Sequence, residues 1–258
     1  MFRDTYPVAW AFHRNTCYWR YQPGNASELS EPVSPFKEYP EQRLVPLPAA
    51  QDLTSPLGTA IRARFSCRQF RDSPLPLAML ATLLHTCYGI QGRVPLGHDE
   101  LLTRPVPSGG ALYPLELYLL VRHVTDLRPG IYHYAVPAHA LELLHAAPVP
   151  PAHLTEIFMG QSYAADAALV VVLTALPARS LWKYADRGYR LILLEAGHLA
   201  QTLNLAIAAF GWGSVNLGGF LDFELGNLLG LDNELEVPLY AMVIGQPAGT
   251  DAGPLRQS

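Results

Sequence analysis

Lys183 and Tyr184 are neighbours in the chain and stand just before a long apolar segment. A lysine beside a tyrosine at the mouth of a buried helix is suited to removing a proton from a substrate. Free side chains of both types hold their protons near neutral pH, so the pair needs burial or a nearby positive charge to act as a base. The pair indicates a catalytic base, and the alternative is a surface lysine followed by a core tyrosine.

Arg64, Ser66 and Arg68 alternate along a second polar stretch. Two planar guanidinium groups and a hydroxyl match phosphate oxygens, which a guanidinium fork binds in a bidentate way that lysine cannot reproduce. This spacing predicts a site for a phosphorylated cofactor. Two surface arginines beside a helix end would give the same pattern.

Two glycine-containing turns could bring the backbone close to a flat ligand. They consist of Pro107, Ser108, Gly109 and Gly110, and of Gly218 and Gly219. Neither has the Walker lysine or the G-x-G-x-x-G spacing, so the P-loop and Rossmann fingerprints are excluded there. Because glycine has no side chain to intrude, its amide can face an acceptor on a ligand. We expect contacts with a ring, with tight β-turns as the alternative.

Other kinds of catalytic site have little support in the sequence. The histidines of the middle region form no H-x-x-x-H pair with a nearby carboxylate, so we expect no metal site. These histidines are His123, His133, His139 and His145. No G-x-S-x-G motif occurs, and nothing beside Cys67 or Cys87 marks either thiol as a nucleophile.

The composition describes a chain that can bury a large core. Half of the 258 residues are hydrophobic, 16% are charged and the net charge is -4, without a run of lysine or arginine. Nucleic acid and membrane surfaces are therefore not expected as partners. Three widely spaced cysteines argue against a disulfide framework. Since the charged N-terminal stretch is unlike a signal peptide, we expect a cytoplasmic protein.

The hydrophobic pattern predicts an α+β fold with helices around a mainly antiparallel sheet. A helix is expected from Asp186, as its N-cap, to Gly211; it is apolar on nearly every side and must be surrounded. Its small residues Ala196, Gly197 and Ala200 would let another backbone approach, from the same subunit or a second one. A loop is expected over 91–99. Further helices are expected from Ser55 and over 76–90, 150–160 and 222–231, and strands over 115–124, 130–136, 139–146, 167–176 and 236–247. Residues 213–220 are expected to form a short strand and a glycine-rich turn.

The chain divides by composition at about residue 50. Residues 1–50 are rich in proline and aromatic residues without a sustained period, whereas 51–258 carry the helix and strand patterns. We expect an arm that packs on the body or on a partner subunit, because its aromatic residues are too many for a solvated tail. They include Tyr6, Trp10, Tyr18, Trp19 and Tyr21.

Taken in order, the motifs resemble the nitroreductase superfamily and, within it, the SagB-type azoline dehydrogenases. The resemblance spans residues 36–247, and its most specific parts are PSGGALYPLE and DRGYRLILLEAGH. The matching segments are Arg64-x-Ser66-x-Arg68-x-Phe70, PSGGALYPLELYLLV from Pro107, GIYHY from Gly130, KYADRGYRLILLEAGHLAQ from Lys183, GxGSVNLGGF to Phe220, and VIGQP from Val243.

The resemblance implies a nitroreductase-like fold and a homodimer that binds FMN at the subunit interface. It assigns the phosphate and ribityl chain of FMN to Arg64, Ser66 and Arg68. It places the Pro107–Gly110 loop against the isoalloxazine ring and the Gly218–Gly219 turn with the Gly219 amide facing flavin N5. Lys183 and Tyr184 match the pair that azoline dehydrogenases use as their base.

This chain departs from typical nitroreductases at three places. It has Ala111 where they carry an asparagine and Gly218 where they carry a glutamate, although azoline dehydrogenases share these small residues. A C-terminal basic residue often helps to bind the phosphate in the family, and Arg256 is the candidate here. The resemblance therefore defines the ring site more closely than the phosphate site.

The activity that the resemblance implies is oxidation of a thiazoline or oxazoline in a modified peptide to the azole. The base removes a proton from Cα, FMN N5 takes a hydride from Cβ, and O2 reoxidises the flavin. A modified precursor peptide and a cyclodehydratase are the implied partners. Two interpretations remain beside it: an NAD(P)H-dependent reductase of nitro compounds or quinones, and a flavoprotein subunit that organises a peptide-modifying complex without turnover.

Overall fold

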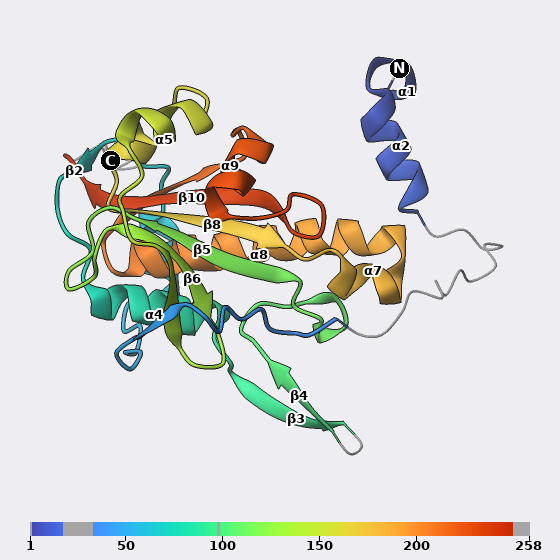
Figure 1. Ribbon diagram of the computed structural model, residues 1–258, viewed down its shortest axis with the longest axis horizontal. Coiled ribbons are helices and arrows are strands. Elements are labelled where there is room, and N and C mark those ends of the chain that lie inside the picture. Colours follow the sequence, from blue (N-terminus) through green and yellow to red (C-terminus); the bar gives the residue numbers. More distant parts are fainter. Residues whose placement is uncertain (1, 18–32, 97–98, 250–258) are drawn as a thin grey trace.

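One antiparallel sheet forms the centre of the molecule. The computed structural model describes residues 2–17, 33–96 and 99–249. The strands run in the order β1-β7-β6-β5-β8-β10-β2, and β9 also pairs with β10 (Figure 1). Their bounds are β1 (Arg43–Pro46), β2 (Phe70–Arg71), β5 (Leu115–Val121), β6 (Gly130–Ala135), β7 (Ala140–His145), β8 (Leu169–Ala175), β9 (Gly213–Leu217) and β10 (Val237–Pro247).

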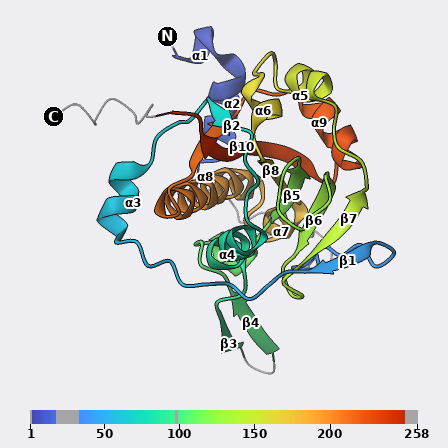
Figure 2. The ribbon, with the colours of Figure 1, turned by 90° about the vertical axis from the view of Figure 1, so that its left-hand side faces the viewer.

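Helices cover both faces of this sheet, as the α+β prediction required. The helices are α1 (Phe2–Thr5), α2 (Pro7–Asn15), α3 (Leu57–Ala63), α4 (Leu77–Tyr88), α5 (Pro151–Ile157), α6 (Tyr163–Asp166), α7 (Ala178–Tyr184), α8 (Asp186–Ala209) and α9 (Asp222–Leu229). Figure 2 shows α4 and α8 on one face and α5 and α9 on the other. The buried side chains accordingly form two hydrophobic clusters, one on each face.

Strand β8 occupies the middle of the sheet because it is apolar on both faces. All seven of its residues are buried. It pairs with β5 on one side and with β10 on the other, so that Val172 lies between Tyr118 and Ala241. A continuous β-branched run of this kind predicts a central strand, and that prediction is confirmed.

Helix α8 is less enclosed than its sequence predicts. Ile192 and Leu199 are fully buried, but Leu193 is 41% and Leu194 is 53% exposed. One side of the helix is therefore uncovered within a single chain. The predicted N-cap is also wrong, because the capping position is Ala185, which offers no side-chain hydrogen bond, and Asp186 is already helical.

Helix α8 has the length and composition of a membrane-crossing helix, and it is the one such helix that the described residues contain. Within the qualifying window, 56% is buried inside the fold. The long core helices of soluble proteins pass the same test, so this property carries little weight.

The described part of the N-terminal arm contacts the body at several places, among them the start of α8 and the edge of the sheet. The guanidinium of Arg187 donates to the Thr16 carbonyl at 2.7 Å, and that of Arg190 donates to the His13 carbonyl at 3.0 Å. These bonds tie the end of α2 to the start of α8. Further along, β1 joins the sheet edge by pairing with β7. The predicted arm residues Tyr18, Trp19 and Tyr21 lie outside the described residues.

The sequence pattern missed β1, β2 and a hairpin where it predicted a loop over 91–99. This hairpin, β3 (Gly92–Leu96) with β4 (Asp99–Thr103), projects from the body (Figure 1). Its described side chains are exposed or half-buried, and Arg93 pairs with Glu100 across the strands at 2.9 Å. A strand that buries no face lacks the alternating apolar pattern by which strands are found.

Candidate functional site

Lys183 and Tyr184 end α7 at a sharp elbow. The next residue, Ala185, has φ 45° and ψ -146°, after which α8 begins. Such backbone angles cost a non-glycine residue on the order of 1–3 kcal/mol and persist where the surrounding structure holds them. The elbow therefore fixes the direction in which the Lys-Tyr pair leaves the helix.

The loop that carries Ser108, Gly109 and Gly110 packs directly on this pair. A Cβ placed on Gly110 would lie 2.7 Å from the Tyr184 hydroxyl oxygen and 2.9 Å from Lys183 Nζ. Gly110 also has φ 66°, and the following Ala111 has φ 53°. The structure thus brings the predicted base and the predicted ring loop together, although they are more than seventy residues apart in the chain.

A buried carboxyl group lies beneath the same loop. The Ser108 hydroxyl accepts a hydrogen bond from the Tyr113 amide at 2.9 Å, and Ser108 is also hydrogen-bonded to Glu195. Glu195 is 2% exposed, and its carboxylate accepts a hydrogen bond from the Tyr88 hydroxyl at 3.3 Å. Burial raises the pKa of Glu195 to about 7, against the opposing effects of Ser108 and the Arg104 charge. No sequence motif pointed to Glu195, although a carboxylate in the middle of an apolar helix is a signal of a special role.

Arg64, Ser66 and Arg68 follow α3 at the other end of α8. Ser66 pairs with Ser214 near the start of β9, and Ser66 and Arg68 line a cavity of about 210 Å³. Arg64 is half-buried and is not among the lining residues. Within the described part of the chain neither guanidinium has an ion-pair partner, so both can receive an anion. The remaining candidate, Arg256, lies outside that part.

The Gly218–Gly219 turn follows β9 and presents open backbone. A Cβ on Gly219 would meet nothing closer than 3.7 Å, and one on Gly218 nothing closer than 3.9 Å. The Gly219 carbonyl accepts a hydrogen bond from the side-chain Nε2 of Gln161 at 3.2 Å. A flat ligand can therefore approach this backbone without displacing a side chain.

A single chain does not bring all the predicted site residues to one place. The Arg64–Arg68 cluster lies where α8 has ended, whereas Lys183 and Tyr184 precede its first residue. Because α8 has 24 residues, it is roughly 36 Å long, which exceeds the length of a flavin mononucleotide. The phosphate cluster and the ring loop are thus two separated half-sites within one chain.

Comparison with known proteins identifies the family. A model described as the nitroreductase family matches residues 61–246, most of the chain. The chain belongs to the nitroreductase family. It is 34% identical over 183 residues to MJ1384 of Methanocaldococcus jannaschii, which is assigned as a nitroreductase; the match covers 71% of the chain and 87% of MJ1384. The family indicated by the motifs is confirmed.

A second relative is a processing protein from Escherichia coli. The chain is 30% identical over 151 residues to the microcin B17-processing protein McbC, covering 55% of the chain and about half (54%) of McbC. The fold of the present chain also matches a chain of the E. coli McbBCD microcin synthetase, which was solved with truncated pro-microcin bound. The TM-score is 0.60 at 21% identity, and the match covers 94% of this chain and 83% of that one. A nitroreductase structure from Anabaena variabilis matches with TM-score 0.72 and 27% identity over 92% of this chain and 45% of that one.

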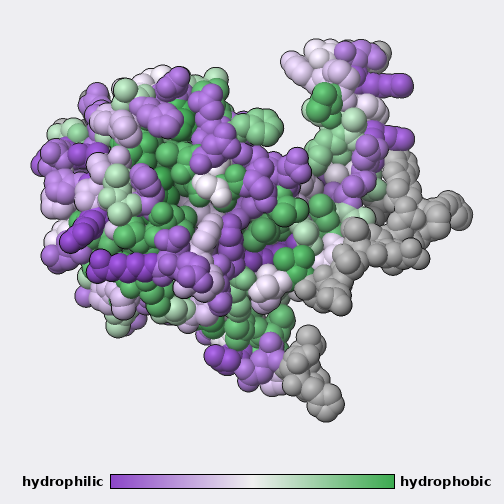
Figure 3. Space-filling view, in the orientation of Figure 1, coloured by the Kyte–Doolittle hydropathy of each residue, from purple (hydrophilic) through white to green (hydrophobic). Residues whose placement is uncertain are grey.

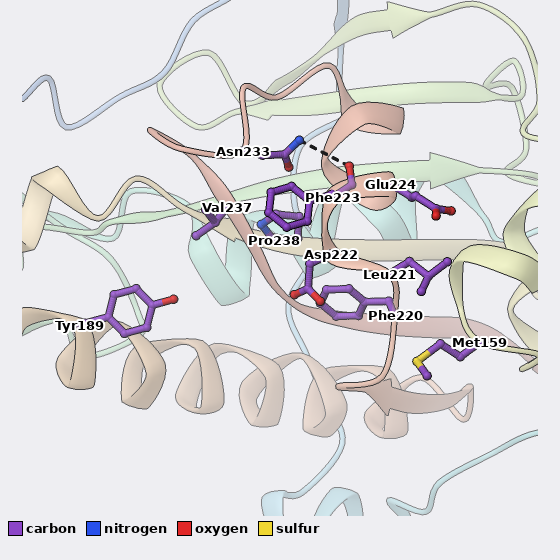
Figure 4. Close-up of a pocket in the computed structure, with 10 residues that line it drawn as sticks. All are labelled: Met159, Tyr189, Phe220, Leu221, Asp222, Phe223, Glu224, Asn233, Val237 and Pro238. Carbon is purple, nitrogen blue, oxygen red and sulfur yellow. Dashed lines mark hydrogen bonds between the residues drawn. The ribbon is translucent and has the colours of Figure 1, made fainter. Parts of the chain in front are cut away.

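The nitroreductase chain also has a larger cavity, which sequence analysis did not predict. Its volume is about 620 Å³. It is lined by Met159, Tyr189, Phe220, Leu221, Asp222, Phe223, Glu224, Asn233, Val237 and Pro238 (Figure 4). These residues come from separate elements, including α8, α9 and β10, so no local motif could reveal them.

The histidines named in the sequence analysis do not gather around a metal site. Across the described residues, the structure has no group of three His, Cys, Asp or Glu side chains that could hold an ion. His133 instead lies between Glu116 and Glu142, and its ring nitrogens are 3.0 Å and 2.7 Å from their carboxylate oxygens. Its surroundings are those of a buried ion pair.

We expect Gly110→Ala to destabilise the nitroreductase and to displace Lys183 and Tyr184. The added Cβ would clash with both polar atoms, and the positive φ alone costs an L-residue roughly 1–2 kcal/mol. Gly211→Ala is a matched control, because Gly211 has φ 74° and nothing within 4 Å of the added Cβ. Urea unfolding of both variants separates the clash from the backbone strain. Equal losses of stability would show that the contact at Gly110 is unimportant.

Proposed function

We propose that this nitroreductase is an FMN-dependent azoline dehydrogenase, which acts in the cytoplasm on a modified peptide. The observation that carries the proposal is the contact of Lys183 Nζ and the Tyr184 hydroxyl with the backbone at Gly110. A base for substrate deprotonation and a loop suited to a flat ring are thereby adjacent. A reductase of nitro compounds does not need a base at that position.

The residues present fit FMN. Ser66 and Arg68 line a cavity, the Arg68 guanidinium has no ion-pair partner among the described residues, and Arg64 is near it in sequence, so these residues would hold the phosphate. Open backbone at Gly218 and Gly219 would accept the edge of the ring system. FMN is favoured over FAD because the sequence has no glycine fingerprint for a pyrophosphate. When bound, FMN supplies the hydride acceptor, which O2 reoxidises.

The protein's own part in the reaction is to hold the ring and to move one proton. Lys183 Nζ or the Tyr184 oxygen takes the proton from the azoline Cα, and each is within reach of a ligand on the Gly110 loop. Lys183 Nζ also lies 5.5 Å from the centre of the Tyr184 ring, so the two side chains stand side by side. The elbow at Ala185 keeps both groups on the loop side of α7.

We further propose that the protein is a homodimer, because one chain holds only two separated half-sites. A second copy could place its ring loop near the first copy's phosphate cluster. The uncovered side of α8, with Leu193 and Leu194, offers an apolar surface on which the two copies could meet. The N-terminal arm could add to this contact through the residues around Tyr6, which is 63% exposed.

The proposed substrate and partner follow the peptide-processing relatives. McbC processes microcin B17, and the McbBCD synthetase was solved with a truncated precursor bound. We infer that the present protein acts on a modified precursor peptide and works beside a cyclodehydratase that forms the azoline. The similarity to MJ1384 favours a second candidate function, NAD(P)H-dependent reduction of nitro compounds or quinones.

The purified protein is expected to be a yellow dimer that releases FMN on heating. Chromatography of the released flavin and sedimentation at low concentration check the two parts. A thiazoline peptide supplied in air should lose two mass units as the azole forms. Bound FAD, or a stable monomer that retains flavin, would contradict the proposal; steady NAD(P)H consumption with a nitroarene and no azole formation would establish the second candidate.

A further inference from the structure

The cavity between α8, α9 and β10 has the size and walls of a ligand site. Its volume of about 620 Å³ is within the ordinary range for pockets that take small molecules or side chains. Phe220, Leu221, Val237 and Pro238 form apolar walls. At the rim, Phe223 is 72% exposed, and hydrophobic surface reaches the outside near α9 in Figure 3.

The cavity is also acidic. Asp222 and Glu224 are the charged residues among those that line it, and both are exposed. Among the described residues neither has an ion-pair partner. Between residues 191 and 249 the chain has no lysine or arginine but has six acidic residues, Glu195, Asp222, Glu224, Asp232, Glu234 and Glu236.

The Asp222 carboxylate is directed into the space shared with Tyr189. Figure 4 shows it pointing toward the side of the cavity on which Tyr189 stands. Burial and the charge of Asp222 together raise the pKa of Tyr189. Asp222 also opens α9, where a negative charge is favourable for the helix. That stabilisation does not neutralise the carboxylate, so a cation in the cavity would still be attracted.

The cavity adjoins the open backbone at Gly219, and one of its lining residues follows the Lys-Tyr pair closely in the chain. Phe220 follows Gly219, whose backbone is open to a ligand. Tyr189 lies in the first turns of α8, five residues after Tyr184. A peptide with its azoline near either group could therefore place a neighbouring side chain in this cavity.

We propose that this cavity is a specificity subsite that takes a lysine or arginine side chain next to the azoline of the peptide substrate. The inference rests on the proposed function for the nature of the substrate. Long cationic side chains have an apolar stem and a charged end, which match the apolar walls and the two carboxylates. An acidic side chain would be repelled there, and a purely apolar one would leave both carboxylates without a partner.

The test compares peptides that differ in one side chain. Fluorescein-labelled peptides with a central thiazoline carry lysine, norleucine or glutamate on either side of the ring. Norleucine keeps the apolar stem of lysine and lacks its charge. Affinity for the FMN-loaded protein is measured by fluorescence polarisation without oxygen, and turnover is measured afterwards in air.

We expect the lysine peptide to bind about tenfold more tightly than the norleucine peptide, as is typical of one charge-assisted contact. The glutamate peptide should bind most weakly. Asp222→Asn with Glu224→Gln should remove the preference for lysine and leave the affinity for norleucine unchanged. Glu234→Gln is the matched control, because Glu234 is exposed in the same acidic segment but does not line the cavity; it should retain the preference.

The outcomes separate this inference from the proposed function. Affinities that do not depend on the side chain overturn the subsite, and they would also be found if a second copy of the chain covered the cavity. Oxidation without a lysine preference supports the proposed function and overturns the subsite. A charge-dependent affinity that the double variant removes, without any oxidation, supports the subsite and counts against azoline dehydrogenation.

Discussion

Replacing Lys183 by alanine or Tyr184 by phenylalanine is expected to slow azoline oxidation by about a hundredfold to ten-thousandfold while FMN stays bound. Loss of a positioned general base typically has an effect of that size. Flavin should be retained because the phosphate cluster at Arg64–Arg68 and the open backbone at Gly219 do not involve either side chain. Turnover of a thiazoline peptide and the flavin content of each variant are the two measurements.

Chemical reduction provides the control for this pair of variants. Reduction of the bound flavin by dithionite and its reoxidation in air need no proton from a substrate carbon. The rates of both steps in each variant should therefore equal those of the unaltered protein. Arg128→Ala, an exposed cation outside the proposed site, should keep normal turnover. Near-normal azoline oxidation by both variants would show that another residue is the base. Loss of flavin from both would mean that the pair holds the fold instead.

The central elements of the fold were predictable because the burial of each one produces a hydrophobic pattern in consecutive residues. The apolar run of β8 reflects burial on both of its faces, and the periodic pattern of α4 reflects burial on one face. Each element was expected near its observed position. Edge elements behave differently. Strand β1 is largely exposed, and the described side chains of the hairpin β3–β4 are exposed or half-buried. Their hydrogen-bonded partners, and not their own side chains, therefore decide their conformation.

The chemistry of the candidate site was visible as motifs, but its arrangement was not. The Lys-Tyr pair and the Gly110 loop meet only because α7 and the loop fold back on each other. The distance between that meeting point and Ser66 is set by the length of α8, which no local motif expresses. The acidic cavity is assembled from elements between Met159 and Pro238, and its lining residues have no common spacing.

A buried network of charges anchors the helix that carries the Lys-Tyr pair. Arg179, in the first turn of α7, is 2% exposed, and its Nη1 lies 2.7 Å from Glu116 Oε1. Its Nε donates to the Ser34 carbonyl at 2.7 Å. Glu116 in turn contacts His133, which is fully buried and also contacts Glu142. A lone glutamate in each of two apolar strands was the sequence signal for this network.

The network should be most stabilising in a defined range of pH. Burial alone would lower the pKa of His133, but hydrogen bonds to Glu116 and Glu142 outweigh it and raise the pKa above 6.5. The contribution of His133 is therefore complete below 6.5 and is lost as the pH rises through its folded pKa. Burial alone would raise the pKa of Glu116 and of Glu142, but His133 and other partners outweigh it and lower both pKa values below 4.5. The contribution of these carboxylates to stability is therefore lost as the pH falls through their folded pKa values.

We therefore expect His133→Leu to lower the free energy of unfolding by roughly 3–5 kcal/mol between pH 4.5 and 6.5, because it leaves two buried carboxylates without their shared cation. The loss should shrink below pH 4.5, where the carboxylates become neutral. Urea unfolding across this range measures both effects. His145→Gln, an exposed histidine on β7, is the control and should change stability little at any pH. A loss that is the same at every pH would mean that His133 contributes through packing volume and carries no charge in the fold.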